Sequence, residues 1–329
     1  MSSGNFTDFM ASGGGKALFG NSTVSALHAV ANQDYIVLDG GYDAKGGGGG
    51  GGGGGRGGNP GGTTGTEPTV TDVYISGDPN VDDSLEFNIT IEFMGDWPDY
   101  LKVQFQAAAD FLSTVIIGDM PDIVYNGQAI DDIVIQASLT NIDGTGGVLG
   151  QAGPTVVRSA DYTPIMGVME FDIADAEAYS AAGLFDDIIL HEMMHVLGFG
   201  TLWNYNGLVE TAVVDDNGTK KPTDDIVESY YIGEAVLAAY NGDGFVFVET
   251  DGGSGTAGGH WDEETYQLEL MTGYIGYYED NGNSDPTDDW DGANYLSDWS
   301  VAALQDLGYT LATDASGIEA SGDLGIEFA

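Results

Sequence analysis

Two histidines four residues apart, with a glutamate directly after the first of them, form the most chemically specific pattern in this sequence. The pattern is H-E-x-x-H, at His191, Glu192 and His195. Residues four apart lie one above the other on an α-helix, so both imidazoles would face the same way and could bind one Zn²⁺. Glu192 would lie beside the metal, where it could take a proton from a metal-activated water that attacks a carbonyl. The spacing therefore predicts a zinc-dependent hydrolase with Glu192 as its general base.

A catalytic zinc of this kind needs one more ligand, because such sites combine three protein ligands with a water molecule. The remaining histidines are His28 and His260. The sequence has no cysteine, which excludes thiolate metal sites, disulfides and thiol nucleophiles. The third ligand must therefore come from a histidine or a carboxylate far from the H-E-x-x-H pattern.

Three stretches of the sequence resemble a known family. They read HEMMHVLGFGTLW, GGHWDEETYQLELMTGYIG and LSDWSVAALQDLGY. Together they resemble the leishmanolysin-like branch of the metzincin metalloproteases, which carries an insertion between the helix-ending glycine and the third histidine. Compact metzincins place that histidine six residues after the second one, where this sequence has Thr201. The resemblance is specific over His191–Gly200 and Gly259–Gly273 and is absent before Thr69.

The resemblance implies a role for each residue that matches the family pattern. It makes three residues the zinc ligands, namely His191, His195 and His260. It also makes Glu192 the general base, Gly198 the turn after the helix, and Met271 the methionine of a turn beneath the metal. The implied activity is that of a zinc metalloendopeptidase acting on proteins or peptides. Family members are often rich in cysteine and carry a cysteine-containing propeptide, so their latency mechanism and disulfide framework do not transfer to this chain.

Each of these residues also has an ordinary structural interpretation. A lone histidine in a glycine-rich loop, such as His260, is usually a surface residue, but the missing third ligand and the adjoining Trp261 favour the metal. Met271 by itself would be a core residue, and its role beneath the metal rests on the resemblance alone. We expect His28 to be solvated or packed; the alternative is that it occupies the zinc in a latent form.

The elements around the pattern predict an α+β fold. Alternation over Leu85–Phe93 predicts a strand with one buried face, and apolar residues at helical spacing over Leu101–Val115 predict a helix that covers the sheet. Further strands are expected at Ile133–Leu139 and Val168–Ile173. The active-site helix begins near Leu184 and ends at Gly198 and Gly200.

These elements fit a metzincin-like zincin with an upper and a lower half. The upper half would hold a twisted mixed sheet and the active-site helix. An irregular, partly helical lower half from Thr201 onward would supply His260 and Met271, with a core helix around Val301–Leu307. An extended peptide substrate would add to the sheet edge at Gly146–Arg158.

A run of ten glycines, Gly46–Gly55, predicts a linker. Before it, Val24–Ala31 and Tyr35–Leu38 suggest one helix and one strand. The predicted division of the chain is an N-terminal piece with the linker (1–68), two catalytic subdomains (69–200 and 201–315) and a C-terminal tail (316–329). Residues 1–68 are expected to be dispensable for folding, because the glycine run would prevent stable packing across it.

The net charge excludes some classes of binding partner. With 53 acidic and 7 basic side chains the formal net charge is −46, which excludes a nucleic-acid binder and argues against an anionic membrane surface. Acidic Gly/Asn loops at Asp215–Gly218, Asn241–Gly244 and Asp280–Gly292 could hold Ca²⁺, although turn chemistry explains them equally well. We expect a monomeric, secreted protein that has neither a membrane-spanning segment nor a recognisable cleavable signal peptide. Cytoplasmic residence is the alternative.

Two other functions are compatible with the same residues. A catalytically inactive, zinc-containing surface or adhesion module would keep the fold for binding, but the intact Glu192 speaks against it. A hydrolase of small amides could use the same zinc and carboxylate, and a closed pocket instead of a long cleft would favour it.

Overall fold

The fold is α+β, as the sequence predicts, and a mixed sheet forms its centre. The computed structural model describes residues 18–21, 27–28, 34–38, 69–215, 226–240, 244–253, 255–275, 294–312 and 320–321. The order in the main sheet is β2-β3-β9-β10-β8-β5-β4, and β1 also pairs with β9. These strands are β1 (Leu18–Asn21), β2 (Leu27–His28), β3 (Tyr35–Leu38), β4 (Val70–Ile75), β5 (Ile89–Met94), β8 (Ile133–Thr140), β9 (Val148–Arg158) and β10 (Pro164–Asp172). Strands β5, β8 and β10 run parallel, whereas β4 and β9 are antiparallel to their neighbours β5 and β10.

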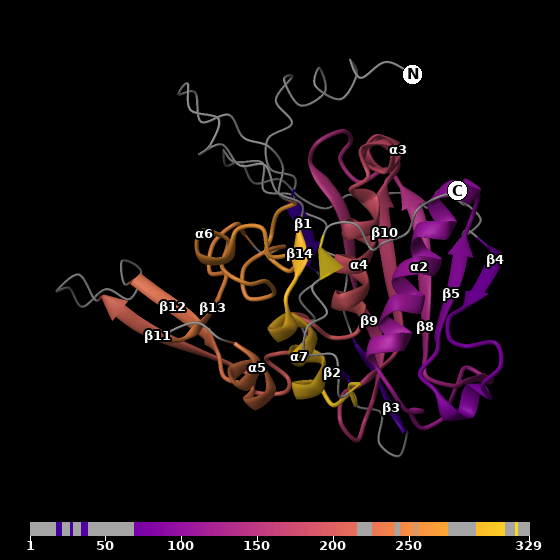
Figure 1. Ribbon diagram of the computed structural model, residues 1–329, viewed down its shortest axis with the longest axis horizontal. Helices are drawn as coiled ribbons and strands as arrows, with labels where there is room; N and C mark the ends of the chain where they lie inside the picture. Colours follow the sequence, from indigo (N-terminus) through magenta and orange to yellow (C-terminus); the bar gives the residue numbers. More distant parts are fainter. Residues whose placement is uncertain are drawn as a thin grey trace, which may run out of the picture.

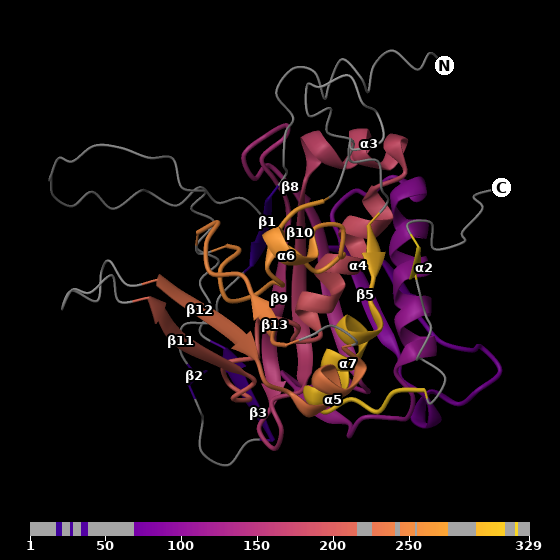
Figure 2. The same cartoon turned by 60° about the vertical axis from the view of Figure 1, so that its left-hand side comes forward.

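Helices α2 (Asp99–Val115) and α4 (Phe185–Val196) lie together on one face of this sheet (Figures 1 and 2). The predicted apolar face of α2 is buried, at Leu101, Phe105, Ala108, Leu112 and Val115. Between the helices and the sheet, edge-to-face aromatic contacts join Phe93, Phe105 and Phe171, with ring centroids 5.4–5.5 Å apart. Such ring pairs stabilise the fold beyond the area that they bury, so this layer holds α2 firmly against β5 and β10. A third helix, α3 (Ile173–Ala182), follows β10 directly and is capped by Asp172, which accepts from the N–H of Ala174.

The strand expected from Leu85 begins later than predicted. Residues Asp83–Leu85 form a 3₁₀ turn instead, because the Asp82 side chain accepts from the N–H of Ser84 and caps it. Leu85 is 70% exposed, while Ile89, Ile91 and Phe93 are fully buried. The alternating residues from Phe87 onward are therefore buried as predicted, but the capped turn leaves Leu85 outside the strand.

The second half of the chain contains more strand than predicted. A three-stranded antiparallel sheet, made of β11 (Val209–Asp215), β12 (Ile226–Tyr231) and β13 (Val246–Val248), extends away from the main body (Figure 1). Helices α5 (Glu234–Ala239), α6 (Glu263–Tyr266) and α7 (Asp298–Asp306) complete this half, with a short strand pair, β14 (Tyr295–Leu296) and β15 (Ala320–Ser321). The predicted C-terminal helix is confirmed, with Ser297 as its N-cap. A small hairpin, β6 (Ile123–Tyr125) and β7 (Gln128–Ile130), lies ahead of β8.

The segment before the glycine run belongs partly to the main sheet. Strand β3 pairs with β9, with Ile36 opposite Val157, and the side chains of Ile36 and Leu38 join the hydrophobic core. Leu27 and His28, which we expected to be helical, pair with β3 as a strand. The glycine run therefore does not prevent packing across it, because Tyr35–Leu38 pairs with the sheet; whether residues 1–68 are dispensable for folding stays a prediction. The division at residues 68, 200 and 315 otherwise stays a prediction.

Replacing Ile36 with alanine should lower the free energy of unfolding by about 2 kcal/mol, because it removes buried methyl groups from the core. The matched control is Val37→Ala on the outer side of the same strand, where Val37 is 37% exposed. Chemical denaturation of both variants measures the difference. A chain starting at Glu67 should lose more, about 3–6 kcal/mol for two apolar side chains. Equal stability of Ile36→Ala and Val37→Ala would contradict the pairing of β3 with β9.

Strand β9 is not a free edge. Its first half, at Val148–Ala152, pairs in parallel with β1, and its last residues pair with β3. The edge that the sequence suggested for a substrate is thus covered by the chain's own N-terminal segment. Within the described ranges, no helix has the length and apolar character needed to cross a membrane.

Candidate metal centre

Helix α4 carries the H-E-x-x-H pattern through the middle of the protein. All of its residues are buried, and Asp186 and Asp187 occupy its first turn, where negative charge complements the helix dipole. The helix ends at Val196, and Gly198 follows with a φ of 107°. These features confirm the predicted helix and its glycine stop.

A second glycine brings the distant histidine to this helix. Gly200 has a φ of 68°, and a Cβ at this position would lie 2.0 Å from the carbonyl oxygen of Gly259. Only glycine fits such a close approach of two backbones. The turn after α4 therefore packs directly against the residue that precedes His260.

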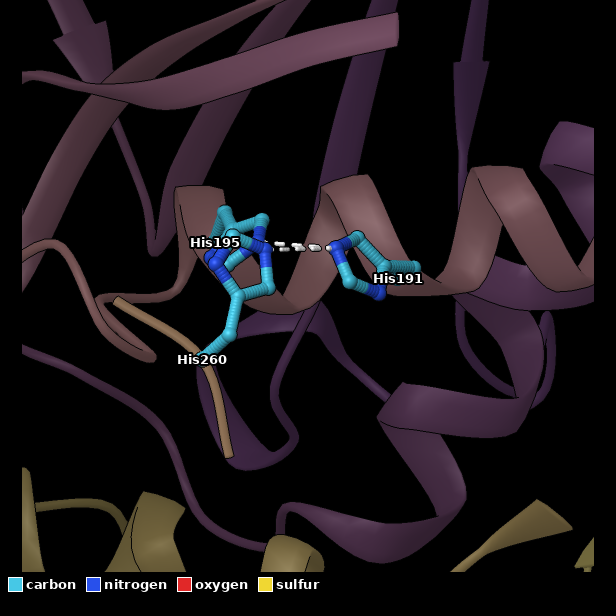
Figure 3. A group of neighbouring side chains, drawn as sticks. All are labelled: His191, His195 and His260. Atoms are coloured by element: carbon cyan, nitrogen blue, oxygen red, sulfur yellow. Dashed lines mark hydrogen bonds between the residues drawn. The ribbon is translucent and has the colours of Figure 1, made fainter. Parts of the chain in front are cut away.

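The structure brings together the three predicted ligands, His191, His195 and His260 (Figure 3). Their side chains are fully buried, and their Nε2 atoms lie 2.9 Å (His191 to His195), 3.0 Å (His195 to His260) and 3.2 Å (His191 to His260) apart. Two rings come from one face of α4, and the third comes from the loop after β13. The backbone of His28 lies in β2, and its side chain lies outside what the structure describes.

The other nitrogen of each ring fixes its tautomer. The Nδ1 atom of His191 lies 2.7 Å from the Leu270 carbonyl oxygen, that of His195 lies 2.9 Å from the Phe199 oxygen, and that of His260 lies 2.9 Å from the Thr256 oxygen. A carbonyl oxygen only accepts, so each Nδ1 carries the proton and donates it. Each Nε2 is therefore an unprotonated acceptor.

Three acceptor nitrogens that converge in a buried site cannot hydrogen-bond to one another. Their lone pairs repel unless a cation lies between them. The separations are close to the value of about 3.3 Å expected between ligands of a tetrahedral zinc with Zn–N distances of about 2.0–2.1 Å. The donor set thus fits zinc, because neutral imidazole is a preferred zinc ligand and the carbonyl oxygens of Leu270, Phe199 and Thr256 orient the rings.

The site also keeps its imidazoles neutral. Burial, reinforced by the neighbouring histidines, holds the pKa of His191 and of His260 well below the usual range, and burial lowers the pKa of His195 to about 4. Because a metal binds only the deprotonated ring, these lowered pKa values favour binding at neutral pH.

Glu192 lies in the same buried region, and its carboxylate is not hydrogen-bonded to any residue that the structure describes. It is fully buried, and neither Oε1 nor Oε2 has a hydrogen-bond partner among the residues that the structure describes. Burial raises the pKa of Glu192 well above its ordinary value. A buried carboxylate without a partner is costly, so the site is arranged for a group that is not part of the fold, such as a water molecule or a substrate.

Strand β9 lies directly against this glutamate. A Cβ on Gly150 would come within 3.0 Å of the Glu192 Oε1 atom and within 3.1 Å of Phe171. Glycine at this position lets the β9 backbone approach the carboxylate. The stretch of β9 next to Glu192 is the stretch that pairs with β1.

Met271 lies in the turn that supports His191. The Met271 carbonyl accepts from the N–H of Trp261, 3.0 Å away, and the preceding Leu270 carbonyl accepts from His191. Met271 is fully buried. Its place beside two ligand-bearing segments agrees with the sequence-based expectation, while its role beneath a metal stays a prediction.

Sequence reasoning missed the groups that hold the ligands in place. The oxygens of Leu270, Phe199 and Thr256 are backbone atoms, so no residue type points to them. Glu269, a fully buried carboxylate two residues before Met271, was also missed. Its only signal was a charged residue between the apolar Leu268 and Leu270.

Other acidic groups do not form a comparable site. Asp119, Asp122 and Asp131 lie close enough together to share a cation, but they lie at the surface, where acidic clusters are common without one. The acidic loops considered for Ca²⁺ fall largely outside the described residues, at 216–225, 241–243 and 276–293. Calcium binding therefore remains untested.

The chain is similar to known proteins over the part that contains this site. The family model described as Leishmanolysin matches residues 114–283, a range that includes α4, the three histidines and Met271. A leishmanolysin homolog from Crithidia fasciculata is 29% identical over 187 residues, which cover 55% of this chain and 26% of the relative. The chain thus spans about a quarter of the length of that curated relative.

Proposed function

Because this chain belongs to the leishmanolysin family of peptidases, we propose that it is a zinc-dependent endopeptidase that hydrolyses peptide bonds of protein substrates. The observation that carries the proposal is the convergence of three unprotonated Nε2 atoms beside a buried carboxylate that no described residue hydrogen-bonds. The family supports metallopeptidase chemistry, and the donor set supports zinc. We also propose that the fold is metzincin-like, with a catalytic subdomain on each side of the three histidines.

Each residue of the site has a distinct part in this proposal. His191, His195 and His260 would hold the zinc, which when bound supplies Lewis-acid chemistry that polarises a scissile carbonyl and activates a water molecule. Glu192 would accept a proton from the attacking water on one of its Oε atoms and pass it to the leaving amine. The positive charge of a cation between the imidazoles would stabilise the ionised form of Glu192, which burial alone disfavours.

The substrate would bind as an extended strand along β9. This strand passes beside Glu192 at Gly150, so a peptide paired with it would place a carbonyl near the carboxylate. In the described conformation Leu18, Gly20 and Asn21 pair with Val148, Gln151 and Ala152 of that same stretch. A substrate that uses this edge must therefore displace β1.

Removing β1 should raise peptidase activity. A chain that starts at Ser25 would lack Leu18–Asn21 but keep β3 in the sheet, and we expect its kcat/KM for a peptide substrate to increase by about tenfold or more, because the binding-competent fraction of molecules rises. Replacing Leu18–Asn21 with prolines in the full chain should have the same effect, since proline cannot sustain strand pairing. If both variants cleave at the rate of the full chain, β1 does not compete with the substrate.

The proposal is tested by digestion of denatured casein with the purified full chain, with and without a zinc chelator. We expect cleavage that the chelator abolishes and that added zinc restores. Zinc binding without any cleavage of proteins or peptides would favour a binding module, and cleavage of small amides alone would favour a small-amide hydrolase. Secretion, a monomeric state and calcium binding stay predictions from the sequence.

A further inference from the structure

Glu269 is a buried carboxylate that the proposed chemistry does not use. Its Oε2 atom accepts from the N–H of Met271 at 2.5 Å, and its Oε1 atom accepts from the N–H of Ser297 at 3.0 Å and from the Ser297 hydroxyl at 2.8 Å. The hydroxyl of Ser300 makes a further short hydrogen bond to Oε1. Burial raises the pKa of Glu269 to about 6, while these donors lower it, so the group is ionised at neutral pH. A charge placed this deep stays buried only because several donors surround it.

One arm of this network leads to His191. The bond from Met271 to Glu269 fixes the turn that contains Leu270, and the Leu270 carbonyl accepts the Nδ1 proton of His191. The N–H of Leu270 is held in turn by the Tyr295 carbonyl at 2.8 Å. The position of this turn therefore sets the orientation and the tautomer of one proposed ligand.

A second arm leads to His260. The indole N–H of Trp261, the residue next to His260, donates to the Ser300 hydroxyl oxygen at 2.7 Å, and that hydroxyl donates to Glu269. The backbone N–H of Trp261 also donates to the Met271 carbonyl at 3.0 Å. Both bonds tie the segment that carries His260 to the groups that Glu269 holds.

We propose that Glu269 is a positioning residue of the metal site, which fixes His191 through the Leu270 carbonyl and His260 through Trp261 and Ser300. The inference rests on the proposed zinc site. It adds that the affinity of this site depends on a carboxylate that touches neither the metal nor the substrate. A carboxylate suits the position because all of its partners are donors, whereas a glutamine amide would turn an N–H₂ group toward one of them.

The test compares Glu269→Gln with Asp132→Asn. Asp132 is an equally buried carboxylate that accepts from the N–H groups of Asn88 at 2.6 Å and Met120 at 2.7 Å, both of which lie outside the metal site. We expect both variants to melt at lower temperature than the wild type. Only Glu269→Gln should weaken zinc binding, by about 10–100-fold, and shift the visible absorption bands of the cobalt(II)-substituted protein. Zinc affinity is measured by competition with a chromophoric chelator.

The outcomes separate this inference from the proposed function. A wild type without a tight zinc site would overturn both, whereas unchanged zinc affinity and an unchanged cobalt spectrum in a folded Glu269→Gln would overturn the positioning role alone. If Glu269→Gln does not fold, Ser300→Ala is the deciding variant, since it removes the hydroxyl that joins Glu269 to Trp261 and leaves the Met271 and Ser297 donors to Glu269 in place. That variant should fold, bind zinc several-fold more weakly and show altered cobalt bands; wild-type values for both measurements would contradict the proposal.

Discussion

Replacing Glu192 with glutamine should leave the zinc in place and lower peptidase turnover by about 10²–10⁴-fold, the usual contribution of a general base. The substitution keeps the size of the side chain and removes no ligand, because the three Nε2 atoms come from histidines. It also removes the carboxylate that we propose takes a proton from the attacking water molecule. The measurements are zinc content per chain and initial rates of peptide cleavage.

The matched control for this change is Glu92→Gln. Glu92 lies on β5 and accepts from the Gln136 side chain at 2.9 Å, away from the three histidines. The same loss of one charge at this position should leave turnover unchanged. A Glu192→Gln variant whose turnover stays within about tenfold of the wild type would exclude Glu192 as the general base.

Replacing His260 with alanine should remove most of the zinc and nearly all of the activity. The change takes away one of three converging nitrogens and one of the donors to the Thr256 carbonyl, which also accepts from the N–H of Gly259 at 3.3 Å. Mutation of a group that hydrogen-bonds to a metal ligand typically lowers metal affinity by about 10–100-fold, so loss of a ligand itself should lower it by more than about 100-fold. Metal analysis after dialysis and chelator competition give the affinity.

The histidine control is His28→Ala. His28 lies on β2, and we expect it not to bind the metal, so zinc affinity and cleavage should match the wild type. Zinc retained in His260→Ala with activity intact would contradict the assignment of the third ligand. A large loss of zinc in His28→Ala would instead support the alternative that His28 occupies the metal in a latent form.

Local signals in the sequence were enough to predict the active-site helix. The glycines after His195, the acidic first turn and the four-residue spacing all act within one element, and the structure confirms α4 at Phe185–Val196. The predicted start of β5 was wrong because the Asp82 side chain caps a turn at Asp83–Leu85, which replaces the beginning of the strand. Hydrophobic alternation alone does not show such competition.

These local signals could not predict the pairing of strands that are far apart in the sequence. The glycine run suggested a detached N-terminal piece, yet Tyr35–Leu38 pairs with β9 and buries two side chains. The sequence of a four-residue strand does not indicate which distant strand it pairs with. The same holds for β1, whose pairing covers the edge that we expected to be open.

In the site, the metal ligands could be predicted from residue types, whereas the groups that orient them could not. The ligand count and the family resemblance pointed to His260, and the structure places it within 3.2 Å of the other two imidazoles. The carbonyl oxygens that set the tautomers belong to residues of any type. Glu269 was missed because a lone glutamate is normally a surface residue, and only its four donors explain its burial.

X-ray absorption at the zinc edge of the purified wild-type chain tests the central claim most directly. With 53 acidic side chains, this protein could collect zinc at its surface, so metal content alone does not locate the site. We predict a four-coordinate zinc with three imidazole nitrogens at about 2.0–2.1 Å and one oxygen from water. A zinc surrounded by carboxylate and water oxygens, with fewer than three imidazoles, would contradict the proposed metal centre.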